Sequence, residues 1–287
     1  RMADAPKTPD SLDSIAGPYP VLLCDVWGVL HNGVAAFPGA VAALARARAA
    51  GKAVILITNA PRPGPVVEGY LERLGVPRES WDRIVSSGDV TRHLIAEGPR
   101  RVFHIGDEAD LAIYDGLDVE LVEEFEASAV VCTGLFDDEA EQPEDYAEML
   151  MRLRARDLPF ICANPDIVVE RGDRLVWCAG ALARDYAHLG GRTLIAGKPY
   201  KPIYDEALAA AAAVLGREVE AREVLAIGDG MLTDVKGAVG VGLDVLFITA
   251  GIHAAEYGDP LEPDPARLAD FFRRQNYVPL AIMPRLG

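Results

Sequence analysis

Four groups of polar side chains in this sequence can do chemistry, and each of them follows a short apolar run. They are Asp25 after VLLC, Thr58 and Asn59 after AVILI, Lys198 after TLIAG, and Asp229 with Asp234 after EVLAIG. A magnesium ion takes oxygen ligands, usually one or two carboxylates with water and a substrate phosphate. A phosphoryl group takes hydroxyl, backbone N–H and ammonium donors. These residue types therefore suit a site for Mg²⁺ beside a phosphoryl group.

Each of these signals is common when it stands alone. An aspartate at a strand end is often a turn or helix cap, and the Gly-Asp-Gly around Asp229 is a frequent turn sequence. The combination is more informative, because open α/β sheets bind ligands at the carboxyl ends of their strands. We therefore expect the four groups to converge. An aspartate placed there, such as Asp25, can attack phosphorus as a nucleophile.

The elements that must position these groups are buried strands and amphipathic helices. The runs VLLCDV, AVILIT, EVLAIG and DVLFIT are continuously apolar, which is typical of strands covered on both faces of a parallel sheet. One intervening helix begins at Pro38, and another carries Ile203, Leu208 and Leu215. This alternation predicts a Rossmann-like, doubly wound α/β sheet, to which we also assign the strand TLIAG before Lys198.

A middle segment has strands of its own, RVFHIG, AVVCTG and PFICAN, and its own helices. We therefore predict a core domain built from residues 1–86 and 191–287, with a second α/β domain, residues 87–190, inserted between them. The acid-rich stretch DDEAEQPED within the insertion is expected to be a solvated loop and helix start.

Composition limits the partners and the compartment. The formal net charge is -16, from 44 acidic and 28 basic residues, which disfavours nucleic acid and anionic lipid as partners. No apolar run approaches the ~20 residues of a membrane-spanning helix. The first residues also lack the apolar stretch of a signal peptide, so we expect a cytoplasmic protein. The cysteines predict buried, reduced thiols: Cys24, Cys132, Cys162 and Cys178.

The motifs together resemble those of the haloacid dehalogenase superfamily, class IIA, whose large α/β cap is shared by pyridoxal and sugar-phosphate phosphatases. The resemblance spans nearly the whole chain and rests on DVWGVLHNG, FPGA, GKAVILITNAPR, ANPD, GKPYKPIY and IGDGMLTDVKGA. It implies a magnesium-dependent, phosphatase-like hydrolase of small phosphorylated metabolites, with sugar phosphates as the leading guess. Caps of this size often pair across a two-fold axis, so a homodimer is a candidate assembly.

The resemblance assigns a metal site by matching positions. Asp25 would be both the nucleophile and a magnesium ligand, the backbone carbonyl of Trp27 a second ligand and Asp229 a third. Asp234 would anchor either the water shell of the metal or Lys198.

The resemblance also assigns the groups around the substrate. Thr58 and the amide of Asn59 would bind phosphate, and Lys198 would neutralise charge between the nucleophile and the phosphoryl group. Asn164 and Asp166, in the segment ANPD, would face the substrate from the cap.

One position breaks the family pattern. Such phosphatases carry a second aspartate two residues after the nucleophile, which protonates the leaving group, and this chain has Trp27 there. Indole has no titratable proton near neutral pH, and general acid–base catalysis contributes roughly 10²- to 10⁴-fold in rate. Turnover is therefore expected to be weak unless another group substitutes. The alternative is a non-catalytic sensor or scaffold that binds phosphorylated ligands.

His31 is a candidate substitute for the missing acid and base, because its ordinary pKa lies near neutral pH. The other interpretation is a hydrogen-bonded loop histidine, and the sequence leaves both open.

Overall fold

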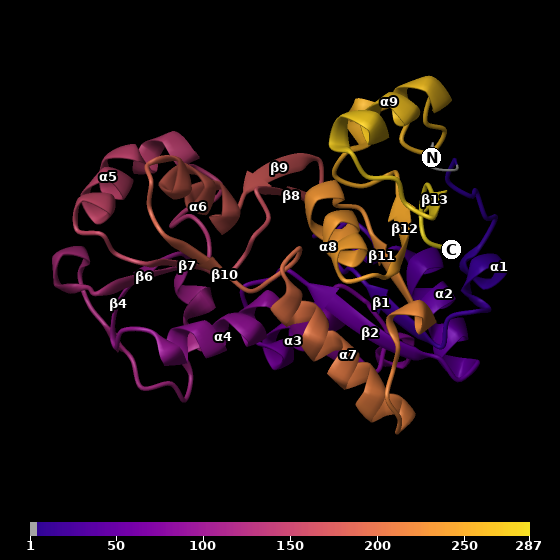
Figure 1. Cartoon of the computed structure of the whole chain (residues 1–287), viewed down its shortest axis with the longest axis horizontal. Coiled ribbons are helices and arrows are strands. Elements are labelled where there is room, and N and C mark those ends of the chain that lie inside the picture. Colours follow the sequence, from indigo (N-terminus) through magenta and orange to yellow (C-terminus); the bar gives the residue numbers. More distant parts are fainter. Residues whose placement is uncertain (1–4) are drawn as a thin grey trace.

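The computed structural model describes residues 5–287 as two sheets with helices around each of them (Figure 1). The larger sheet has six parallel strands in the order β13-β12-β11-β1-β2-β3. Its strands are β1 (Val21–Cys24), β2 (Ala53–Thr58), β3 (Arg83–Ser86), β11 (Val224–Gly228), β12 (Asp244–Ile248) and β13 (Ala281–Met283). This arrangement confirms the predicted Rossmann-like fold.

Helices cover both faces of this core sheet, as the continuously apolar strands require. In β1, Leu22 and Cys24 belong to one apolar cluster, while Val21 and Leu23 belong to the cluster on the opposite face. The first cluster includes side chains from α1 (Leu12–Ala16), α2 (Pro38–Ala49) and α3 (Gly64–Arg73). The second includes side chains from α7 (Lys201–Leu215), α8 (Lys236–Gly240) and α9 (Pro265–Gln275), among them Phe271 and Phe272.

The smaller sheet, with its helices, forms the cap. Its five parallel strands follow the order β10-β7-β6-β4-β5. They are β4 (Arg101–Ile105), β5 (Glu120–Leu121), β6 (Ala129–Cys132), β7 (Phe160–Cys162) and β10 (Thr193–Ile195). Helices α5 (Ala147–Ala155) and α6 (Ala179–His188) pack on one face, and α4 (Ser87–Glu97) packs on the other.

The structure corrects the place of the strand before Lys198. We expected TLIAG in the core sheet, but β10 pairs with β7 at the edge of the cap sheet, with Thr193 beside Phe160. A three-residue apolar strand does not specify its partner, so its sequence fits either sheet. A boundary drawn by sheet membership would follow Ile195. Sheet membership is only one way to divide the chain, so the predicted division into core and cap at residues 86/87 and 190/191 stays a prediction.

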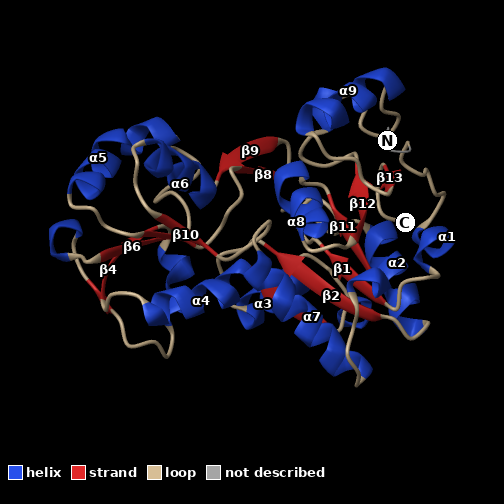
Figure 2. Ribbon diagram, in the orientation of Figure 1, coloured by secondary structure: helices blue, strands red, loops and turns tan. Residues whose placement is uncertain are grey.

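An unpredicted antiparallel hairpin lies between the two sheets (Figures 1 and 2). It consists of β8 (Val168–Arg171) and β9 (Arg174–Trp177). All four cysteines are buried and free, as predicted. Within residues 5–287, no helix is long and apolar enough to cross a membrane.

Candidate active site

Three carboxylates converge at the carboxyl end of the core sheet. Asp25 directly follows β1, Asp229 directly follows β11, and Asp234 lies in a short π-helical turn, Met231–Val235. All three are buried, and one oxygen of each lies within 4.8 Å of the others. The predicted convergence is therefore present. A separation of this size allows the three carboxylates to surround a single cation.

Local backbone geometry holds Asp229 in this cluster. Its Oδ2 accepts a hydrogen bond of 2.9 Å from the backbone N–H of Ile252. Gly28 adopts a φ of +87°, and a Cβ added there would lie 2.3 Å from the same Oδ2. Glycine is thus required at position 28 both for its backbone conformation and for the close approach of the carboxylate.

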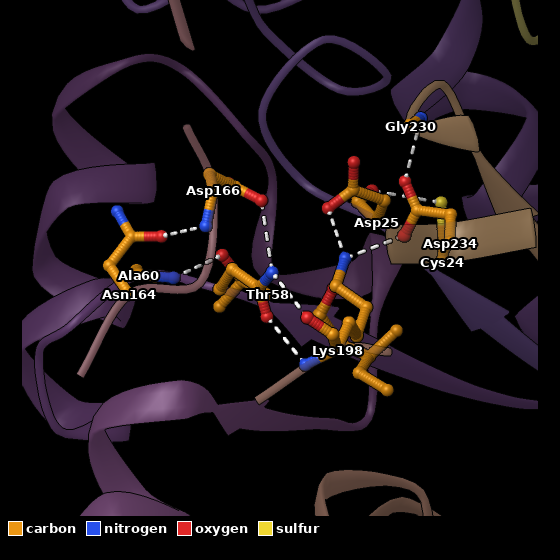
Figure 3. Close-up of polar contacts among 11 residues, drawn as sticks. Cys24, Asp25, Thr58, Ala60, Asn164, Asp166, Lys198, Gly230 and Asp234 are labelled. Carbon is orange, nitrogen blue, oxygen red and sulfur yellow. Dashed lines mark hydrogen bonds and ion pairs between the residues drawn. The ribbon is translucent and has the colours of Figure 1, made fainter. Parts of the chain in front are cut away.

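Lys198 lies between two of the carboxylates (Figure 3). Its Nζ lies 2.8 Å from Asp25 Oδ1 and 2.7 Å from Asp234 Oδ1, and it donates a third bond of 3.1 Å to the carbonyl of Ile57. Burial would lower the pKa of Lys198, but the charges of Asp234 and Asp25 outweigh it and hold the pKa well above its usual value. The side chain is therefore a fixed positive charge beside Asp25.

Lys198 alone does not balance the three carboxylates of the cluster. Burial, with the neighbouring Asp25 and Asp234, raises the pKa of Asp229 well above its usual value. Burial and Asp25 also raise the pKa of Asp234, to about 7. A divalent ion would offset this repulsion, and carboxylate oxygens are the ligands that magnesium prefers. The residues present therefore fit the predicted Mg²⁺ site.

Thr58 and Asn59 lie beside Lys198 at the end of β2. The Thr58 hydroxyl accepts a hydrogen bond of 3.1 Å from the N–H of Ala60. The Asn59 side chain accepts a hydrogen bond of 2.8 Å from the N–H of Lys198. It donates hydrogen bonds of 3.2 Å to the Lys198 carbonyl and 2.9 Å to Asp166 Oδ1. Because these bonds occupy the Asn59 side chain, its backbone N–H is the group left for the predicted phosphate contact.

The ANPD segment of the cap meets the core through this same asparagine. Asn164 Oδ1 accepts a hydrogen bond of 3.1 Å from the N–H of Asp166, which orients the turn. Asp166 in turn accepts a hydrogen bond from the side-chain amide of Asn59 (Figure 3). Burial raises the pKa of Asp166. Asn164 and Asp166 both line the cavity between core and cap. Both residues therefore lie at the cavity, and their contact with a bound substrate stays a prediction.

The cavity has a volume of about 740 Å³ and is lined by the carboxylate cluster at its base and by cap residues opposite. Asp137, Asp138 and Glu139 belong to this lining. The stretch DDEAEQPED is the predicted solvated loop and helix start, and its first residues also line the cavity. Its first residues face the cavity because the cap sheet carries them there, which no local pattern in the sequence indicates.

Comparison with known proteins identifies the family. Residues 22–120 match the family described as haloacid dehalogenase-like hydrolase, and residues 195–273 match one described as HAD-hydrolase-like. A solved structure of a haloacid dehalogenase-like family hydrolase from Brucella suis is 60% identical, with a TM-score of 0.89, and the match covers 97% of this chain and 100% of that one. The chain belongs to the haloacid dehalogenase-like hydrolase family.

More distant relatives in this family have named activities. D-glycerol 3-phosphate phosphatase from Mycobacterium tuberculosis is 29% identical, with 96% of this chain and 77% of that protein covered. A solved structure of glycerol phosphate phosphatase from the same species, in complex with magnesium, is 27% identical, covers 83% and 70% of the two chains, and has a TM-score of 0.63. The predicted identification as a capped, class IIA, phosphatase-like hydrolase is confirmed.

In this haloacid dehalogenase-like hydrolase, the Trp27 side chain joins the core to the cap. Its indole N–H donates to the carbonyl of Glu170 in the hairpin, and a second core–cap bond runs from the Gly172 N–H to the Asn32 carbonyl at 2.9 Å. The indole lies against Gly33, where an added Cβ would be 2.6 Å from the ring. Trp27, at the position where the resemblance led us to expect a second aspartate, therefore makes a structural contact between core and cap.

His31 packs between aromatic rings beside Trp27. Its ring centroid lies 5.1 Å from that of Trp27 and 5.7 Å from that of Tyr70. The His31 Nδ1 accepts a hydrogen bond of 2.9 Å from the N–H of Gly33. Burial lowers the pKa of His31 to about 4. The imidazole is therefore neutral at pH 7, and these contacts favour the interpretation as a hydrogen-bonded loop histidine.

Proposed function

We propose that this hydrolase removes phosphate from small phosphorylated metabolites through an aspartyl phosphate on Asp25, with Mg²⁺ as its cofactor. The observation that carries the proposal is the contact between the buried Asp25 and Lys198, at the edge of a three-carboxylate cluster. Lys198 offsets the negative charge that would otherwise repel a phosphate dianion from the nucleophile.

The metal would be held by Asp25, Asp229 and the backbone carbonyl of Trp27, with Asp234 behind them. A bound Mg²⁺ supplies positive charge that offsets the phosphoryl oxygens. The Thr58 hydroxyl and the Asn59 backbone N–H would donate to the same oxygens. Asp234 also accepts a hydrogen bond of 3.0 Å from the N–H of Gly230, and this bond fixes the carboxylate that orients Lys198.

The reaction has two steps. A carboxylate oxygen of Asp25 bonds to phosphorus as the phosphorus–oxygen bond to the alcohol breaks, and the departing oxygen takes a proton from solvent water. Water then attacks phosphorus and gives up a proton to the solvent, the bond to Asp25 breaks, and inorganic phosphate leaves. Trp27 supplies no proton in the first step and accepts none in the second. We therefore expect slow turnover of alkyl esters such as sugar phosphates, and faster turnover of esters whose alcohols leave without protonation.

Sugar phosphates and related polyol phosphates are the leading substrate guess, in line with the glycerol phosphate activity named for the relative from Mycobacterium tuberculosis. We also propose a cytoplasmic location, a homodimer as the candidate assembly, and the division into a core (residues 1–86 and 191–287) and a cap (87–190).

The alternative is a non-catalytic sensor or scaffold for phosphorylated ligands. The observation in its favour is that Trp27 occupies the position of the acid and uses its indole to bind Glu170. Such a protein would keep the metal and phosphate contacts while lacking turnover.

Hydrolysis of p-nitrophenyl phosphate with and without Mg²⁺ separates these functions. We expect metal-dependent turnover that Asp25→Asn lowers by at least about 10³-fold, because the nucleophile is lost. The matched control is Asp205→Asn, which removes one exposed carboxylate that pairs with Lys201 on α7. Unchanged hydrolysis in Asp25→Asn would refute the aspartyl phosphate. Ligand binding with no turnover in the wild type would favour the sensor.

A further inference from the structure

The wall of the cavity beyond the phosphate site is rich in carboxylates. Besides the three of the metal cluster and Asp166, the acidic lining residues are Asp107, Asp110, Asp137, Asp138, Glu139 and Glu170. The arginines in the same wall are Arg62 and Arg171. The cavity wall would therefore surround the alcohol part of a bound ester mainly with negative charge.

Both arginines already have carboxylate partners. Arg62 Nε lies 2.7 Å from Asp110 Oδ1, and Asp110 is only 5% exposed. Arg171 makes a bidentate contact with Asp138, at 3.1 and 3.0 Å, and lies 3.9 Å from Glu139. Bidentate arginine–carboxylate pairs are among the stronger charged contacts in proteins. Among the lining residues, all of which the structure describes, no arginine is left to receive a second anionic group from a substrate.

The remaining lining suits hydroxyl or ammonium groups. The rings of Trp27, Tyr70, Phe136 and Trp177 line the cavity together with these carboxylates. Aromatic faces attract cations and pack against apolar carbon, while carboxylates accept from hydroxyl and ammonium donors.

A buried hydroxyl in the same wall also lacks a partner. Thr133 lines the cavity, is 3% exposed, and its Oγ has no hydrogen-bond partner within residues 5–287. Buried hydroxyls are normally paired, so this oxygen marks a place for a polar group of a ligand.

We propose that the cavity selects phosphate monoesters whose alcohol carries hydroxyl or ammonium donors and no second anionic group, because Arg62 and Arg171 are neutralised by Asp110 and Asp138. This inference rests on the proposed function, and it adds a substrate class defined by charge. Carboxylated or doubly phosphorylated metabolites are excluded.

Three phosphate esters of similar size test the selection. Glycerol 3-phosphate and 3-phosphoglycerate differ by one hydroxymethyl group in place of a carboxylate, and phosphoethanolamine carries an ammonium. We expect kcat/KM with Mg²⁺ to be at least about tenfold lower for 3-phosphoglycerate than for glycerol 3-phosphate, because like charges are brought together. Phosphoethanolamine should also exceed 3-phosphoglycerate in kcat/KM, and a lower value would contradict the proposal. Equal or better use of 3-phosphoglycerate overturns the proposal.

Freeing one arginine should relax the selection. Asp138→Asn leaves the Arg171 guanidinium without its bidentate partner, and the Asp138 side chain is 35% exposed, so the substitution should be tolerated. We expect the ratio of kcat/KM for 3-phosphoglycerate to glycerol 3-phosphate to rise about tenfold. Asp205→Asn, with the same change of net charge far from the cavity lining, should leave the ratio unchanged. An unchanged ratio in Asp138→Asn contradicts the proposal.

The test does not depend on efficient turnover. Dissociation constants of the two glycerol-derived esters, measured by calorimetry on Asp25→Asn with Mg²⁺, should show the same preference. Turnover of p-nitrophenyl phosphate reports on the proposed function, whereas the ratio reports only on the selection, so the two can fail separately. Asp110→Asn, which frees Arg62, provides a second variant with the same expected direction.

Discussion

The two ends of the cavity use charge in different ways. At the base, Lys198 is 2% exposed and contacts two carboxylates that are nearly as buried. In the cap wall, Arg171 and Asp138 form a pair in which each side chain is more than a third exposed. Buried charges depend strongly on their partners, whereas solvent screens half-exposed pairs. The base therefore has one fixed geometry, whereas the Arg171–Asp138 pair of the wall can be altered at little cost in stability.

The largest effect should come from breaking the base. Lys198→Met leaves Asp25 and Asp234 facing each other without a cation, and removing one partner of a buried ion pair costs about 3–5 kcal/mol in the free energy of unfolding. Turnover of p-nitrophenyl phosphate should fall as well. The control is Lys201→Met, whose ammonium is exposed and pairs with Asp205 on the helix surface. Urea unfolding that gave similar stability for both variants would show that the base is not an interdependent cluster.

A smaller effect is expected where the core meets the cap. Trp27→Asp introduces a carboxylic acid where the proposed mechanism lacks one and should raise kcat for an alkyl phosphate by about 10²-fold. Trp27→Phe keeps an aromatic ring but removes the indole N–H that binds Glu170. It should therefore loosen the hairpin without raising kcat. Hydrogen exchange of residues 168–177 measures the loosening. Equal rates for the aspartate and phenylalanine variants would mean that the missing acid does not limit turnover.

The smallest effect concerns His31. Its pKa in the folded protein is about 4, below the ordinary value of 6.5, so the unfolded chain takes up the proton first as pH falls. The contribution of the neutral His31 to the free energy of unfolding is fully present above pH 6.5 and is lost progressively between pH 6.5 and 4. Between pH 7 and pH 5.5, this group should lower the free energy of unfolding by about 1 kcal/mol. His31→Gln should reduce that slope in denaturant titrations and leave turnover unchanged, whereas loss of activity would restore its candidacy as acid and base.

The comparison also shows what the sequence could reveal. Asp25 and Asp229 were predictable because their strands are continuously apolar, and parallel strands of one sheet end at the same edge. The predicted strand AVILIT agrees with β2 in both of its bounds.

The cap wall was not predictable in the same way. The bond between Trp27 and Glu170 joins positions 143 residues apart, and the cavity-facing loop at Asp138 depends on how the cap sheet meets the core. Neither the pairing of β10 with β7 nor this docking is encoded in a local pattern, because short strands and polar loops fit many tertiary settings.

The short connection from the cap to Lys198 has a mechanical consequence. Ala196 and Gly197 alone separate the edge strand β10 from the lysine that balances the charge of Asp25. A swing of the cap that displaces this strand pulls on the backbone bearing the ammonium. An ester too bulky for the closed cap would thus draw Lys198 away from Asp25, which would lower its own rate of hydrolysis without any direct clash at the reacting centre.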